Sequence, residues 1–253
     1  MNFDPQALQR VAIRMHFDPE LVEQVYAGLP VDGLCERGRE LVLRVDRRAW
    51  QTDQFRRSRL LHGLLEAYPV SALVTGLGPL DAFFSSPDFH DCVQTRGLVA
   101  LTFGSWLLPT AGPFSTLERA IVQVCHLRKH TQRGWCCAPG LVALDLPGGT
   151  VEAWQGFRKN LGPDPVAELT AQASRSLKMP DFEGTEHVLV ERAPEGGASI
   201  GWASPELVGL LQSLEHPVSM ARAQELARSH GADAGEEEDV LAGLRADGLL
   251  IQR

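Results

Sequence analysis

The sequence predicts an α+β fold, with an N-terminal helical domain over residues 1–132 and a C-terminal winged-helix-like domain over residues 133–253. Two observations lead to this prediction. Apolar residues recur at helical intervals through the first half of the chain, whereas the second half contains β-rich runs, a hairpin turn and then three short helical segments. A chain of 253 residues has room for two modest domains.

The helical domain begins with two N-cap signals. Asp4-Pro5 and Asp18-Pro19 each combine a capping side chain with a proline at the first helical position. A long amphipathic stretch with many arginines follows, from about Leu34 to Tyr68. Its basic side chains fit either a solvated face or a docking face for an acidic partner.

Two further helices are expected before residue 130. Ser86-Pro87 predicts the start of a helix that runs toward Leu108. Ser115, with Glu118 three residues later, has the pattern of a capping box and predicts the start of the next helix.

The second half of the sequence contains the clearest β signal. Residues 186–204 read "EHVLVERAPEGGASIGWAS", which predicts two strands around a Pro-Glu-Gly-Gly turn. A strand ending at Gly148-Gly149 precedes this hairpin, and a helix is expected from Asp164-Pro165. Three helices follow the hairpin, and the last begins in the acidic run at Glu236.

Composition limits the partners and the compartment. The net charge of −8 disfavours nucleic acid and anionic membranes. Five cysteines give no even-numbered disulfide framework, and charges run through the first 20 residues, where a signal peptide would need an apolar segment. We therefore expect reduced thiols and a cytoplasmic location.

One uncharged stretch, Gly97–Leu117, is long enough to span a bilayer. Pro109, Gly112 and Pro113 interrupt it. Because these residues break helices, the stretch predicts a buried helix followed by a turn, and no membrane partner is expected.

Winged-helix domains serve two common functions, DNA reading and peptide capture. From Ser204 to Arg253 there are four arginines and nine acidic residues, and the last helix begins with the acids Glu236–Asp239. A groove-reading helix contacts DNA through its first turn, and phosphate binding needs cations. The charge therefore favours a peptide, and a winged-helix DNA-binding transcription regulator is kept as the alternative.

Peptide capture predicts a specific site. A hairpin can accept an extended peptide as an added strand, and a groove beside the last helix would receive alternate side chains. Trp202 either forms a wall of this groove or seals the core between strand and helix. The expected peptide-binding residues are Ala198, Ser199, Ile200, Gly201, Trp202, Asp239, Val240, Gly243 and Leu244.

The order of these elements resembles a known family. Residues 186–250, with their strand–turn–strand, Ser-Pro helix start and terminal Gly-Leu-Leu, look like a RiPP recognition element, which binds the leader of a ribosomally synthesised peptide. Residues 83–108 and 114–124, "FFSSPDFHDCVQTRGLVALTFGSWLL" and "FSTLERAIVQV", are similar to partner subunits of multinuclear non-haem iron oxidative enzymes, including those of methanobactin biosynthesis.

The resemblance implies a role and a set of partners. The chain would be a non-catalytic accessory subunit, without catalytic residues or a cofactor of its own. It would bind the leader of a precursor peptide and present the peptide to an iron-dependent TIM-barrel oxidase in a hetero-oligomer. The iron would belong to that partner enzyme.

The alternative of a small metal-binding protein depends on one cluster: Cys125, His126, His130, Cys136 and Cys137. Thiolates and imidazoles are zinc ligands. Adjacent cysteines on a strand point to opposite faces, however, so only one of the last two could join a site. Packing of these cysteines as small apolar residues is the favoured interpretation.

His90, with Asp88 and Asp91, has the residue types of a facial metal triad. All three lie near an expected helix start, where acidic residues are favoured by the helix dipole. We therefore expect no metal site there.

Overall fold

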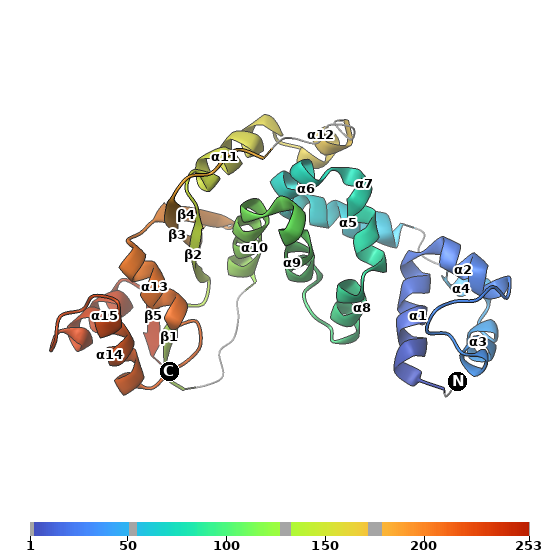
Figure 1. Ribbon diagram of the computed structural model, residues 1–253, viewed down its shortest axis with the longest axis horizontal. Coiled ribbons are helices and arrows are strands. Elements are labelled where there is room, and N and C mark those ends of the chain that lie inside the picture. Colours follow the sequence, from blue (N-terminus) through green and yellow to red (C-terminus); the bar gives the residue numbers. More distant parts are fainter. Residues whose placement is uncertain (1–2, 51–54, 127–132, 172–178, 253) are drawn as a thin grey trace. The chain divides into compact units, whose positions relative to one another are not determined.

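A computed structural model describes residues 3–50, 55–126, 133–171 and 179–252 (Figure 1). It confirms the α+β class, with helices through the N-terminal part and small antiparallel sheets toward the C-terminus. The chain forms two compact units. Unit 1 comprises Met1–Gly112 and Arg158–Lys178, and unit 2 comprises Pro113–Phe157 and Met179–Arg253.

The first two helices of unit 1 form as predicted. They are α1 (Pro5–Phe17) and α2 (Pro19–Tyr26). The Asp4 carboxylate accepts the Gln6 N–H at 2.9 Å, and the Asp18 carboxylate accepts the Leu21 N–H at 3.1 Å. These bonds satisfy amide groups that a helix start otherwise leaves without partners.

The amphipathic stretch becomes three separate helices: α3 (Glu36–Leu43), α4 (Arg47–Trp50) and α5 (Arg56–Ala67). Asp46 accepts the Arg48 N–H at 2.9 Å in the turn before α4. Among the apolar residues that set the helical pattern, Leu64 and Leu65 are buried, whereas Leu41 and Val45 are exposed.

The rest of unit 1 packs around an aromatic core. Its helices are α6 (Pro69–Thr75), α7 (Leu77–Leu80), the short 3-10 helix η1 (Asp81–Ser85), α8 (Pro87–Gln94), α9 (Val99–Ala111) and α12 (Pro165–Ala171). Phe83, Phe89 and Phe103 are fully buried there. α12 packs against α5 and α6.

The prediction of a single helix from Ser86 toward Leu108 is wrong, because this segment forms two helices, α8 and α9. Arg96 has a positive φ of 55°, which a right-handed helix does not allow. The Gly97 N–H bonds to the Cys92 carbonyl at 2.8 Å and closes the turn.

The capping box predicted at Ser115 is also wrong. Helix α10 (Pro113–Cys125) begins two residues earlier, after Gly112 turns the chain with a φ of 51°. Proline suits this first helical position because its φ is already helical. Ser115 is buried inside the helix, and Glu118 accepts the Trp154 indole N–H at 3.1 Å instead of capping.

The uncharged stretch is therefore divided between α9 and α10 by a turn at Gly112 and Pro113, as predicted, whereas Pro109 lies inside α9 and does not end it. Within the described residues, no helix combines the length and apolar character needed to cross a bilayer.

Unit 2 contains two antiparallel sheets. Their strands are β1 (Trp135–Cys137), β2 (Leu141–Pro147), β3 (Thr185–Arg192), β4 (Ala198–Trp202) and β5 (Leu250–Gln252). The larger sheet has the order β2–β3–β4 and includes the predicted hairpin, and the smaller sheet pairs β1 with β5. β5 was not expected from the sequence, and the strand ending at the Gly148-Gly149 turn is preceded by a separate strand, β1.

Helices cover both faces of the larger sheet (Figure 1). Val188 and Val190 of β3 pack with Leu117 and Val124 of α10, and Leu189 faces the core formed with α13. The expected boundary between residues 132 and 133 would separate α10 from this sheet. Helix α11 (Thr150–Asn160) begins in the same core and continues into unit 1.

The three predicted C-terminal helices form: α13 (Pro205–Ser213), α14 (Met220–Ser229) and α15 (Glu237–Ala246). Ser204 and Ser219 cap the first two, each accepting an amide N–H three residues later. Val208, Leu211 and Leu241 join these helices in one core with Trp135 of β1.

Candidate functional site

Strand β4 forms one edge of the three-stranded sheet. In the described structure it pairs with β3 alone, and Val190 lies opposite Ile200 in the register. The Ala193 N–H bonds to the Gly197 carbonyl at 3.1 Å, and the Ala203 N–H bonds to the His187 carbonyl at 3.0 Å. These two bonds mark hydrogen-bonded residue pairs just outside both ends of β4.

The orientation of the β4 backbone follows from these pairs. Hydrogen-bonded and non-hydrogen-bonded pairs alternate along an antiparallel ladder. Ser199 and Gly201 therefore direct their N–H and C=O groups toward β3. Ala198, Ile200 and Trp202 direct theirs toward the open edge.

The side chains of β4 alternate between the two faces of the sheet. Ala198 and Ile200 pack against the core beneath α10. Trp202 lies on the same face of the strand as Ala198 and Ile200, yet 66% of its surface is exposed. The interpretation of Trp202 as a core aromatic is therefore wrong, because its place at the end of an edge strand leaves the indole without a neighbouring strand.

The edge of β4 lacks the usual features that prevent strand pairing. Its sequence, ASIGW, contains no charged residue and no proline. Edge strands of folded proteins commonly carry such residues, because exposed backbone groups otherwise pair with another chain. The five expected peptide-binding residues of β4 thus lie together on an open, uncharged edge.

The four expected peptide-binding residues of α15 lie elsewhere in unit 2. Helix α15 makes its main contacts with α14 and β5 (Figure 1). Leu244 packs partly into the core with Leu241, while Asp239 and Gly243 are exposed. Val240 is half-buried. The structure assembles the β4 residues on one edge and places the α15 residues beside the smaller sheet.

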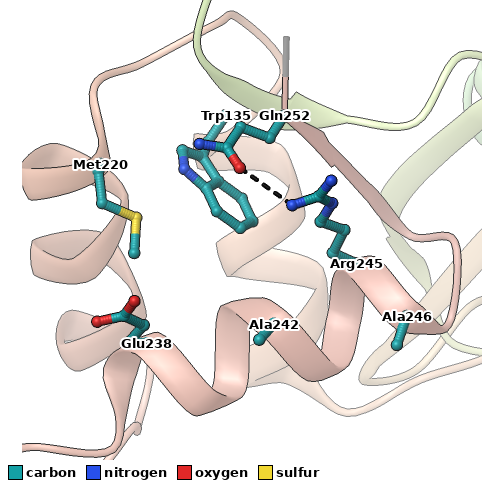
Figure 2. Close-up of a pocket in the computed structure, with 7 residues that line it drawn as sticks. All are labelled: Trp135, Met220, Glu238, Ala242, Arg245, Ala246 and Gln252. Carbon is teal, nitrogen blue, oxygen red and sulfur yellow. Dashed lines mark hydrogen bonds between the residues drawn. The ribbon is translucent and has the colours of Figure 1, made fainter.

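Sequence reasoning missed a cavity at this smaller sheet. The cavity has a volume of about 570 Å³. Trp135 in its wall is only 5% exposed, and the indole Nε1 has no hydrogen-bond partner within the described structure. Figure 2 shows the lining side chains, which are Trp135, Met220, Glu238, Ala242, Arg245, Ala246 and Gln252.

The cavity lining contains one acidic and one basic side chain, Glu238 and Arg245. Glu238 and Arg245 both belong to α15, with Ala242 between them (Figure 2). An Arg245 Nη1–H donates to Gln252 Oε1 at 3.0 Å. No local pattern could have identified this site, because β1, α14, α15 and β5 each contribute to it.

The cysteines of the proposed metal cluster have different environments. Cys125 is exposed and Cys136 is buried. The Cys137 thiol donates to the Leu211 carbonyl at 2.9 Å, and burial raises the pKa of this thiol to about 12. His126 Nδ1 lies 2.8 Å from the Val122 carbonyl, and His130 lies outside the described residues.

The His90 side chain is buried in unit 1. Its Nε2 lies 3.0 Å from the Phe84 carbonyl, and burial lowers the pKa of the imidazole. Over the part of the chain that the structure describes, no group of three or more His, Cys, Asp or Glu side chains is placed to hold a metal ion.

Unit 2 is strongly acidic near both features. Residues 179–252 contain 14 acidic side chains and four arginines. Glu237 at the start of α15 is largely buried, and its carboxylate accepts from Arg228 Nε at 2.6 Å and from the Gly235 N–H at 2.9 Å. This carboxylate is thus used inside the fold, while Glu238 and Asp239 face solvent.

No protein-family model matches this chain, and no curated protein matches its sequence.

Proposed function

We propose that the chain binds an extended peptide as an added strand along the open edge of β4. The observation that carries this proposal is the set of outward-facing backbone groups at Ala198, Ile200 and Trp202, on an edge with no charge or proline. A peptide strand satisfies such groups by continuing the antiparallel ladder or by forming a parallel one.

Trp202 supplies the side-chain contact in this mode of binding. Its exposed indole lies at the end of the strand, where it can cover the apolar side chains of the incoming peptide. Tryptophan is enriched among residues that dominate binding energy at protein interfaces. Main-chain bonds then give affinity, and the indole contributes selectivity.

The charge of unit 2 favours a peptide with basic residues over a nucleic acid. Over residues 179–252, which include β4 and the last three helices, 14 acidic side chains outnumber four arginines, and this balance disfavours phosphate. Binding of a peptide as an added strand needs no basic protein surface, because the hydrogen bonds form between the peptide groups of the two backbones. This argument weighs against the alternative of a DNA-binding regulator.

The biological setting comes from the family that the sequence resembles. We place the chain in the cytoplasm as the non-catalytic partner of an iron-dependent TIM-barrel oxidase that modifies a ribosomal precursor peptide. β4 would hold the leader segment, and the partner would supply the iron and the oxidative chemistry. Holding substrate and enzyme in one hetero-oligomer raises their effective concentration.

A proline substitution tests the β4 edge directly. Peptides selected from a random displayed library against the intact chain would serve as probes, with binding measured by calorimetry. Ile200→Pro removes an outward N–H, whereas Ile200→Ala loses a similar amount of packing and keeps that N–H. We expect Ile200→Pro to weaken binding about fivefold relative to Ile200→Ala, which corresponds to about 1 kcal/mol for one neutral hydrogen bond lost at a binding interface.

Hydrogen exchange provides the second readout. Bound peptide should slow exchange at the amides of Ala198, Ile200 and Trp202, which face solvent in the free chain. Equal affinities of the proline and alanine variants, or protection elsewhere with none on β4, would overturn the proposal.

The partner assignment needs a separate experiment. If the neighbouring gene encodes an iron-barrel enzyme, that protein should co-purify with this chain and require it to modify the adjacent precursor peptide. Full activity of the enzyme without this chain would refute the role of partner, while the peptide-binding test at β4 would stand on its own result.

A further inference from the structure

The cavity at the smaller sheet has a buried donor that lacks an acceptor. Trp135 is anchored on both sides of its backbone, because its N–H and C=O bond to Val218 at 2.8 and 2.9 Å. The backbone of Trp135 is therefore held in place. Its indole is 5% exposed in the cavity wall, and the Nε1–H has no partner among the described residues. Buried polar groups in folded proteins nearly always pair with a protein group, an ordered water or a ligand, so the cavity beside this donor is a place where a ligand could supply the acceptor.

The two charged groups define the length of the ligand. Glu238 and Arg245 are seven residues apart on α15, which corresponds to about 10 Å along the helix axis at 1.5 Å per residue. The adjacent ammonium and carboxylate of a simple amino acid are too close together to reach both. A ligand that meets both groups must carry its cation and its anion at opposite ends.

The middle of the cavity is apolar. Ala242 and the ring of Trp135 lie between the two charges, while Met220 stands beside Glu238 and Ala246 lies beyond Arg245 (Figure 2). This lining suits an aliphatic stem, and the aromatic face also attracts a guanidinium or ammonium group that passes over it. The figure shows the indole nitrogen on the side of the ring that faces Met220.

We propose that this cavity binds the carboxy-terminal basic residue of a peptide. The terminal carboxylate would pair with the Arg245 donors left free by Gln252, since a guanidinium has five N–H groups. The carbonyl of the preceding peptide bond would accept the buried Trp135 Nε1–H after the Met220 side chain, which lies on that side of the ring, moves aside. The basic side chain would cross the apolar lining to reach the Glu238 carboxylate.

This assignment gives each polar group of the cavity a partner. An anionic ligand without a cation would leave Glu238 facing a like charge, and a purely cationic ligand would leave Arg245 and the indole N–H unused. The site is independent of strand addition at β4, because none of its lining residues belongs to that strand.

The simplest probe is Nα-acetyl-L-arginine, which carries all three ligand groups. We expect it to shift the Trp135 indole N–H resonance of the full chain saturably, with a dissociation constant of about 1 mM or tighter for a ligand of this size. Trp135→Phe assigns the resonance among those of the five tryptophans.

Two matched compounds test the ligand groups separately. Nα-acetyl-L-citrulline has a neutral side chain of nearly the same shape, and Nα-acetyl-L-argininamide lacks the carboxylate. Each should bind at least about fivefold more weakly, the effect expected when one charged hydrogen bond is lost. Equal binding of either compound, or no shift with acetyl-arginine, would overturn the proposal.

Variants on the surface of α15 avoid the risk of unfolding. Glu238→Gln and Arg245→Met should each weaken acetyl-arginine binding, whereas Glu236→Gln, at an exposed carboxylate outside the cavity lining, should leave it unchanged. Equal loss in all three variants would indicate a general charge effect and contradict the site. Ile200→Pro should not affect this probe, so the β4 proposal can fail without it.

Discussion

The two edges of the three-stranded sheet differ in how their outward backbone groups are used. At the β2 edge, Gln212 donates to the Ala143 carbonyl at 3.5 Å and to the Asp145 carboxylate at 3.1 Å, and the strand ends in Pro147. At the β4 edge, the described structure provides no such cover. One edge is partly covered and the other is open in the described structure, so the proposed strand addition is expected at β4 and not at β2.

The two edges also differ in their side chains: β2 carries a charged residue and β4 carries an exposed aromatic residue. Asp145 of β2 also holds His187 Nδ1 at 2.6 Å, so a charged side chain occupies the β2 edge. β4 presents Trp202 instead. Charges on an edge strand discourage pairing and an exposed aromatic residue favours it, which assigns the two edges opposite roles.

The largest expected effect tests the direction of the β4 backbone. Gly201→Pro removes an N–H that bonds to β3, and should lower the free energy of unfolding by about 2–3 kcal/mol, because a ladder hydrogen bond is lost and its carbonyl acceptor is left unpaired. Ile200→Pro removes an outward N–H and should cost no more than about 1 kcal/mol beyond Ile200→Ala. Urea denaturation measures both values.

Similar losses in the two proline variants would show that the alternation inferred for β4 is wrong.

The second effect concerns Trp202. Because the indole is mostly exposed, Trp202→Ala should change the free energy of unfolding by no more than about 0.5 kcal/mol, the usual range for surface substitutions. Binding of a selected peptide should nevertheless weaken at least about tenfold, which is the behaviour of an interface anchor. A large loss of stability with unchanged peptide affinity would identify Trp202 as a structural residue.

The sequence was sufficient for most elements whose signals are local, although the local capping pattern at Ser115 and Glu118 misplaced the start of α10. The Asp4 and Asp18 caps, the hairpin turn and the Ser204 and Ser219 caps each involve side chains within a few residues of the bond they make. Their geometry depends little on the rest of the fold, so pattern and structure agree.

Features that join residues far apart in the sequence could not be predicted from local patterns. β1 and β5 pair across most of unit 2, and the cavity beside them collects side chains from four elements. The sequence left Trp202 open between a groove wall and a core aromatic, and only the strand order and the exposure of the indole show that it lies on an edge. The break at Arg96 requires a positive φ, which the arginine itself does not signal.

The third prediction addresses the β2 edge. Asp145→Ala removes the partner of both His187 and Gln212, and should lower the free energy of unfolding by about 1 kcal/mol, since these groups are partly exposed. Denaturant titration gives the value. An unchanged stability would mean that the Asp145 side chain shields the β2 edge without holding the fold together.

The smallest effect is expected at Gln212. Its side chain is exposed and its bond to Ala143 is long, so Gln212→Ala should change stability by no more than about 0.5 kcal/mol. Peptide affinity should also stay within a factor of about two, because the β2 edge is still limited by Pro147 and Asp145. If this variant instead bound a second peptide, with slowed exchange at the Ala143 amide, then Gln212 alone would separate the two edges. In that case, whether an edge of this sheet can accept a peptide strand would depend on one covering side chain rather than on the residue composition of the edge strand.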